Sequence, residues 1–156
     1  MNTIIDPSFV AASKDESGKI YVDRFEDGLR FIIRRGPSSI NAYIGVPTVH
    51  PLAGHSYNDL PIRAHGGLTF SGEGKDGNRF PAGFWWYGWN YSHCDDLCFY
   101  DLKDGDYSKS DKAWTVEEIE KDSWETLYDF KALLKLSEAI AVKSMFYTNL
   151  PRSKMR

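Results

Sequence analysis

The chain has 156 residues, a formal net charge of −3 and 15% aromatic residues. This length suits one domain with a continuous core, so we expect a single globular domain over residues 1–156, with flexible ends at about 1–17 and 150–156. The acidic balance argues against a protein that binds a nucleic-acid polymer by neutralising its phosphates, because such proteins concentrate basic residues on one face.

The first third of the chain predicts an antiparallel meander. Residues 19–25 alternate apolar and polar side chains as a half-buried strand does, and EDG at 26–28 is a good hairpin turn. Asp-Gly supplies the positive φ values that a tight turn requires. Further strands are expected at 29–35 and 40–47, with GPSS as the turn between them.

The middle third predicts a long loop and an aromatic strand. Residues 47–61 contain three prolines and little periodicity, which is typical of a surface loop, and loops of this length are often functional. A short or bulged strand is expected within 62–72, followed by a strongly β-prone strand at 83–93. The aromatic residues of that strand fall on both parities, so both of its faces should be covered.

The last third predicts helix. TVEE at 115–118 is a capping box, in which the Thr115 hydroxyl and the Glu118 carboxylate each satisfy a free amide of the first turn. Apolar residues recur at helical spacing over 116–140, uninterrupted by Gly or Pro. The predicted fold class is therefore α+β: an antiparallel sheet with a C-terminal helix or helix pair packed on one face.

The sequence favours a cytoplasmic setting with no membrane partner. The opening MNTIIDPSFV lacks the basic start and the long apolar run of a signal peptide, and no stretch approaches the roughly 20 apolar residues of a membrane span. Cys94 and Cys98 have no spacing typical of a disulfide. We expect both cysteines to be buried as small hydrophobic residues.

Four histidines offer candidate chemistry: His50, His55, His65 and His93. The first three lie within sixteen residues of one another, and His93 follows the aromatic run. The tetrapeptide HCDD at 93–96 adds further ligand-competent side chains. One hypothesis is a divalent metal held by two histidines and a carboxylate, although neither HxxxH nor paired CxxC spacing occurs. The cofactor therefore stays unknown, and the second hypothesis requires none.

The second hypothesis is metal-free acid–base catalysis. His65 and His93 would exchange the proton, because histidine titrates nearest neutrality, and Asp96 would orient one imidazole. The backbone amides of Gly66 and Gly67 would hold phosphate oxygens. A structural role is the alternative for each of them, since a histidine beside a Gly-Gly turn is often a hydrogen-bonded turn residue.

A ligand site is expected around the aromatic strand. In FWWYGW at 84–89, Trp85, Tyr87 and Trp89 share one face of a strand, and Phe84 and Trp86 share the other. Most of these rings should belong to the core, while one set stacks on a planar base of the ligand. Gly88 would leave room for the ligand, and one arginine of the pair at 34–35 would bind its phosphate or carboxylate. The candidate ligand-binding residues are His50, Gly66, Gly67, Thr69, Trp86, Tyr87, Trp89 and Arg34.

The segments NAYIGVPTVHPLAG, HGGLTFSG and FWWYGWNYSHCDD together resemble a group of small bacteriophage and prophage proteins with YxGVPxxHPLYG, HGGLT(F/Y)S and WxGFDxxHxxD motifs. The similarity covers about residues 40 to 125. The matching positions are His50, Pro51, His65, Gly66, Gly67, Trp86, Gly88, His93 and Asp96. Asn90 replaces the usual aspartate and Asp95 a usual glycine, which argues against an acid–base role at position 90.

The resemblance implies a phage accessory protein that acts in the cytoplasm of the host cell and counters host defences. The leading hypothesis is a histidine-dependent hydrolase that binds a nucleotide-like small molecule and cleaves a phosphodiester. One alternative is a protein that sequesters such a ligand without cleaving it. Another is a protein-interaction inhibitor of a host enzyme. The oligomeric state is left open, a homo-oligomer included.

Overall fold

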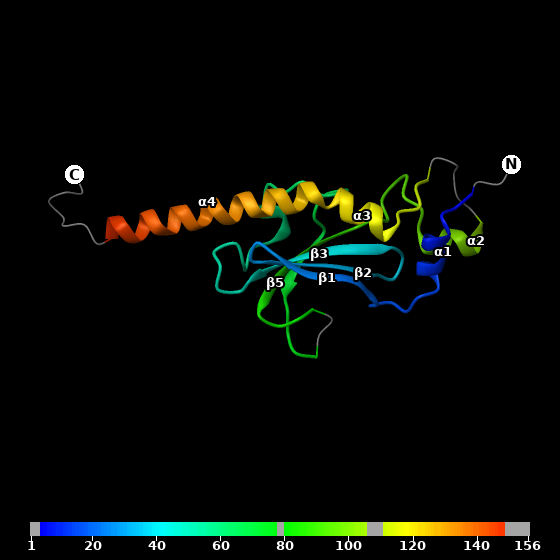
Figure 1. The fold of residues 1–156 in the computed structure, drawn as a ribbon, viewed down its shortest axis with the longest axis horizontal. Helices are drawn as coiled ribbons and strands as arrows, with labels where there is room; N and C mark the ends of the chain where they lie inside the picture. The colour runs from blue at the N-terminus through cyan, green and yellow to red at the C-terminus, as the bar shows by residue number, and fades with distance from the viewer. Residues whose placement is uncertain (1–3, 78–79, 106–110, 149–156) are drawn as a thin grey trace.

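The computed structural model describes residues 4–77, 80–105 and 111–148. Its centre is a five-stranded antiparallel sheet with the strand order β1-β2-β3-β5-β4. The strands are β1 (Ile20–Glu26), β2 (Leu29–Arg35), β3 (Ile40–Pro47), β4 (Phe70–Glu73) and β5 (Phe84–Asn90). A layer made of α3 (Val116–Asp122) and α4 (Trp124–Thr148) covers one face of the sheet (Figure 1). The predicted α+β class, with a C-terminal helix pair on one face, is confirmed.

The N-terminal meander forms as predicted. β1, β2 and β3 coincide with the three predicted strands to within one residue. The turn between β1 and β2 has positive φ angles at Asp27 (49°) and Gly28 (83°), which is the conformation that favours Asp-Gly. On its other side β2 pairs with β3, so that Arg34 lies opposite Asn41.

β5 is buried on both faces, as its aromatic residues predicted. Tyr87 and Trp89, exposed by 0% and 1%, join the main core beneath α4, where the Tyr87 ring lies 5.4 Å from that of Phe130. Trp86, exposed by 0%, lies on the opposite face in a second cluster that includes Tyr43. The two faces of the sheet therefore have separate hydrophobic clusters.

The N-terminal segment forms a helix that the sequence did not predict. α1 (Pro7–Ser13) lies within residues 1–17, where we expected a flexible end. The Asp6 carboxylate caps α1 by accepting the amide hydrogen of Ser8 at 2.8 Å, and proline suits the first helical position. Phe9 is only 2% exposed, so α1 is part of the core.

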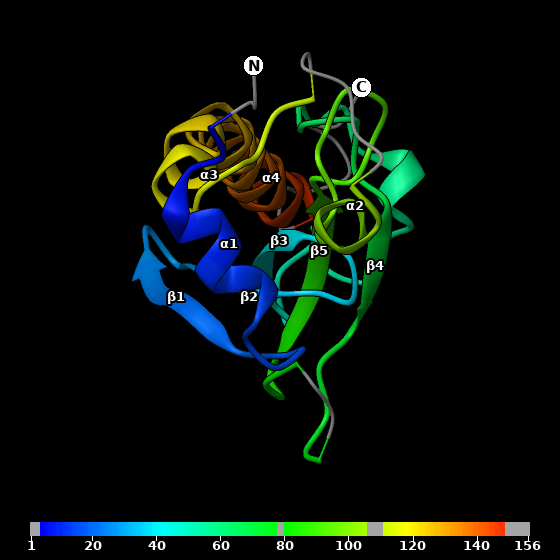
Figure 2. The same ribbon diagram turned by 90° about the vertical axis from the view of Figure 1, so that its right-hand side faces the viewer.

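A second short helix, α2 (Phe99–Asp104), packs against α1, and Figure 2 shows both from that end of the molecule. The rings of Phe9 and Phe99 lie 5.0 Å apart. Arg35 stabilises this end: it donates four hydrogen bonds to backbone carbonyls, two of them at the end of α1, and its guanidinium lies 4.2 Å from the Phe99 ring. Cations favour helix C-termini, so this arginine has a structural role.

The predicted capping box begins α3. The Thr115 hydroxyl accepts the Glu118 amide hydrogen at 3.2 Å, and the Glu118 carboxylate accepts that of Thr115 at 3.3 Å. α4 follows Ser123, and its C-terminal half extends beyond the sheet (Figure 1). Among the described helices, none is long and apolar enough to cross a bilayer. The flexible end predicted at 150–156 lies outside the described residues.

Phe130→Ala should lower the free energy of unfolding by about 3–5 kcal/mol, because Phe130 is 0% exposed and its loss leaves a cavity beside Tyr87. Tyr128→Ala on the exposed side of α4 is the control, with an expected change below about 0.5 kcal/mol. Urea denaturation followed by circular dichroism measures both variants. Equal losses would contradict the packing of α4 on the sheet through Phe130.

Candidate functional site

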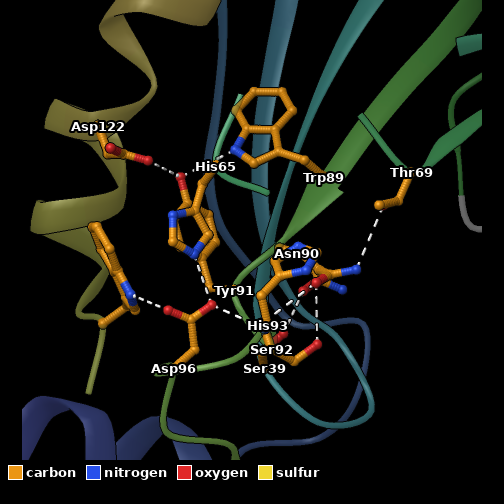
Figure 3. A network of polar contacts seen from close by, with 12 residues as sticks. Ser39, His65, Thr69, Trp89, Asn90, Tyr91, Ser92, His93, Asp96 and Asp122 are labelled. Atoms are coloured by element: carbon orange, nitrogen blue, oxygen red, sulfur yellow. Dashed lines mark hydrogen bonds and ion pairs between the residues drawn. The ribbon is translucent and has the colours of Figure 1, made fainter. Parts of the chain in front are cut away.

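The three predicted catalytic residues lie in one cluster at the end of β5 (Figure 3). The ring centroids of His65 and His93 are 5.6 Å apart. Asp96 contacts both residues: Nε2 of His65 lies 2.7 Å from Asp96 Oδ2, and the backbone amide of His93 donates to the same oxygen at 3.0 Å. The structure therefore brings together His65, His93 and Asp96.

The Asp96 side chain is 4% exposed, and both of its carboxylate oxygens have hydrogen-bond partners. Its second oxygen, Oδ1, accepts the indole hydrogen of Trp114 at 2.8 Å. A β-bridge between Asp96 and Lys112 brings this tryptophan, which precedes the N-cap of α3, to the cluster. A carboxylate held by several donors has one orientation, so Asp96 fixes the position of the His65 ring. Trp114 was not predicted as a site residue, because nothing in its local sequence pattern indicates a partner.

The His65 ring rests on an aromatic platform. It stacks on Tyr91 with a centroid distance of 4.6 Å and an interplanar angle of 9°. The Tyr91 hydroxyl donates to Asp122 at 2.8 Å and accepts from the indole of Trp89 at 3.0 Å. Burial raises the pKa of Tyr91 well above its usual value, so the hydroxyl stays protonated at neutral pH. Tyr91 and Asp122 were likewise not predicted as site residues.

The HGG turn is built from two left-handed residues, Gly66 (φ 68°) and Gly67 (φ 84°). A Cβ on Gly66 would lie 2.2 Å from Nε2 of His93, so this glycine makes room for the imidazole. The amide of Gly67 donates to the carbonyl of Ala64 at 2.9 Å and closes the turn. The prediction that the Gly67 amide holds a phosphate is therefore wrong in this conformation.

The two histidines differ in their access to solvent. His65 lines a surface pocket of about 280 Å³ with Arg63, Ala64, Asp122, Glu125 and Thr126. Nε2 of His93 is buried against Gly66 and has no hydrogen-bond partner within the described part of the chain. His93 is not among the residues that line the pocket. The pair is therefore close together, as predicted, but only His65 reaches the pocket.

Arg63 ties the segment that carries His65 to α4. Its backbone amide donates to Asp129 at 2.8 Å, and its guanidinium donates to the same carboxylate at 3.1 and 2.9 Å. The hydrogen bonds from Arg63 hold the pKa of Asp129 below its usual range. The same guanidinium lies 3.6 Å from the Glu125 carboxylate, so Arg63 is shared between Asp129 and Glu125. The carboxylates of Asp122 and Glu125 outnumber this one arginine among the described residues that line the pocket, which gives the pocket an acidic character.

The structure places the predicted stacking rings in the core instead of beside a ligand. Trp86, Tyr87 and Trp89 are exposed by 0%, 0% and 1%. The Tyr87 hydroxyl donates to the carbonyl of Leu52 at 2.6 Å, and burial raises the pKa of Tyr87 to about 12. These rings have no free face on which a base would stack.

The remaining predicted ligand residues lie outside the His65 cluster. His50 joins the 47–61 loop to α4: its Nδ1 accepts the Leu52 amide hydrogen, and its Nε2 lies 3.6 Å from the Glu138 carboxylate. Thr69 and Arg34 line a pocket on the other face of the sheet.

The described residues contain no group of three or more His, Cys, Asp or Glu side chains placed to hold a metal ion. Cys98 is buried, as predicted, and burial raises the pKa of its thiol. Cys94 is exposed, so the expectation that both cysteines are buried is wrong for this residue.

No protein-family model, curated protein or solved structure matches this chain. The resemblance to phage proteins therefore stays a prediction that rests on the three motifs. The geometry of the described residues has to carry any functional conclusion.

Gly66→Ala should destabilise the fold by at least about 1 kcal/mol, because it combines a left-handed backbone with a clash against His93. Gly67→Ala is the matched control, since its backbone is also left-handed but a Cβ would meet nothing within 4 Å. Thermal unfolding compares the variants, and imidazole NMR signals report displacement of His93. A larger effect at Gly67 would contradict the contact between Gly66 and His93.

Asp129→Asn should cost more stability at pH 7 than at pH 3. The pKa of Asp129 is lower in the folded chain, so its pairing with Arg63 stabilises the fold above the unfolded value of about 3.9 and is lost as the pH falls through the folded value. Urea unfolding of both proteins at the two pH values measures the difference. A difference that does not shrink at pH 3 would exclude a charged Arg63–Asp129 pair as its source.

Proposed function

We propose that the protein is a hydrolase in which His65 removes a proton from water and the substrate is a nucleotide-like small molecule. The observation that carries the proposal is the His65–Asp96 pair, in which an imidazole nitrogen lies 2.7 Å from a carboxylate that is 4% exposed. A buried carboxylate that orients an imidazole beside a pocket suits general-base catalysis. The substrate class rests on the resemblance to phage proteins.

Asp96 determines which nitrogen of His65 is basic. An ionised carboxylate only accepts hydrogen bonds, so Nε2 carries the hydrogen and Nδ1 keeps its lone pair. Nδ1 accepts a proton from water while the water oxygen bonds to the electrophilic centre. As the bond to the leaving group breaks, the imidazolium returns the proton to that group, or to solvent where the group leaves as a neutral molecule, as nicotinamide does. One water is consumed and His65 is regenerated.

The acidic character of the pocket bears on the bond that is attacked. Asp122 and Glu125 line the pocket beside His65. Carboxylates repel a phosphate, whereas they stabilise the positive charge that develops on a sugar ring when the bond at its anomeric carbon breaks. We therefore favour an N-glycosidic bond of a nucleotide-like molecule over the phosphodiester that the sequence predicted.

Turnover of a defined panel tests the proposal. NAD⁺ and adenosine supply N-glycosidic bonds, cyclic and linear dinucleotides supply phosphodiesters, and chromatography separates the products. We expect cleavage of an N-glycosidic substrate and a loss of roughly 10²–10⁴-fold in kcat for His65→Ala, because general-base catalysis contributes about that much. His55→Ala is the matched control, since His55 is exposed and does not line the pocket.

The panel also separates the alternatives. A member that binds but returns intact after the protein is heated would support ligand sequestration in place of hydrolysis. Cleavage that persists in His65→Ala would remove His65 from the mechanism. If no member of the panel is bound or consumed, both the hydrolase and the sequestering hypothesis are contradicted for these ligands.

A further inference from the structure

A second pocket lies on the face of the sheet opposite α3 and α4. Its volume is about 260 Å³, and its lining includes Arg34, Asn41, Tyr43, Thr69, Phe70 and Asn90. Successive residues of an extended strand point to opposite faces. At the end of β5, Asn90 therefore faces this pocket while Tyr91 stacks on His65.

A row of polar side chains crosses the sheet at this pocket. Arg34 of β2 pairs with Asn41 of β3, and Asn41 pairs in turn with Asn90 of β5. Directly paired residues point to the same face, so one guanidinium and two amides lie side by side. Thr69 extends the row: its hydroxyl oxygen lies 3.5 Å from the Asn90 amide nitrogen (Figure 3).

Arg34 is buried against two aromatic rings that contact each other. It is 7% exposed, and its central guanidinium carbon lies 4.0 Å from the ring centroid of Phe80 and 4.7 Å from that of Tyr43. Both rings lie within cation–π distance of the guanidinium, which keeps its positive charge. Arg34 is the only charged residue among the described residues that line the pocket.

The next row of the sheet forms an aromatic wall. Tyr43 pairs with Gly88, which pairs with Phe70 on β4. A Cβ on Gly88 would lie 2.5 Å from the Tyr43 ring, so the space that we expected Gly88 to leave for a ligand is filled by this ring. Phe80 stacks on Phe70 at 5.0 Å. The pocket thus has an aromatic wall beside a polar one.

We propose that this pocket binds a single aromatic ring that carries a phosphate or a carboxylate. The anion pairs with Arg34, in addition to the contacts that Arg34 makes within the protein. It also accepts the second amide hydrogen of Asn41 and of Asn90, whose first amide hydrogens go to the hydroxyls of Tyr43 and Thr69. The ligand ring packs against Tyr43 and Phe70. A volume of 260 Å³ is below the roughly 300 Å³ at which drug-sized pockets begin, so one ring fits and a dinucleotide does not.

Isothermal titration calorimetry with three small probes tests the proposal. Phenyl phosphate and benzoate carry the two anionic groups, and benzyl alcohol is the neutral counterpart. We expect at least one anion to bind at least about tenfold more tightly than benzyl alcohol. None of the probes contains an N-glycosidic bond or a phosphodiester, so failure of the hydrolase proposal would leave this result unchanged.

Asn90→Asp is the decisive variant, because it adds a negative charge to the polar row without changing the side-chain shape. The Asn90 carbonyl oxygen accepts from the Ser92 amide and hydroxyl, and a carboxylate oxygen serves the same donors. Binding of the anion should weaken at least about tenfold while that of benzyl alcohol stays the same. Arg34→Gln should show the same loss. Arg24→Gln is the control, because Arg24 lies on β1, does not line the pocket, and pairs its positive charge with Glu120 of α3.

Three outcomes would overturn the proposal. The first is no binding of either anion at millimolar concentration. The second is an affinity for benzyl alcohol equal to that for the anions. The third is unchanged anion binding in an Asn90→Asp variant that has the same melting temperature as the unsubstituted protein. This result does not depend on whether Arg34→Gln folds.

Discussion

The buried carboxylate of Asp96 is the constraint on which the candidate site depends. A charge this poorly exposed is costly unless hydrogen bonds satisfy it, and Asp96 obtains them from the HGG turn, the end of β5 and the segment before α3. Three stretches that are distant in the sequence converge for this reason. His65 is oriented as a consequence, because its Nε2 supplies one of the required donors.

The same site is continuous with the core. The Tyr91 ring beneath His65 is 1% exposed, and its hydroxyl joins the Trp89 indole to Asp122 at the end of α3. The position of the imidazole therefore depends on how the helical layer packs on β5. This arrangement favours a rigid site, since displacement of the ring would disturb buried aromatic contacts as well as hydrogen bonds.

Local patterns predicted the strands and the capping box because turn chemistry and alternation act over a few residues. α1 was not predictable in this way, since burial of Phe9 depends on Phe99, far along the chain. The grouping of His65 with Asp96 was predicted, but the Trp114 donor reaches Asp96 only through a tertiary bridge. The predicted stacking role of Trp86 failed because aromatic composition does not reveal which rings remain exposed.

β5 joins the two pockets through its register. Neighbouring residues at its end, Asn90 and Tyr91, face the Arg34 pocket and the His65 platform respectively. A slip of one residue against β3 would exchange these faces and place an aromatic ring in the polar row. Both pockets would be lost together. An insertion or deletion of one residue in β5 would therefore disrupt both pockets. The chain can change its length at this end of the sheet only in the connecting loops.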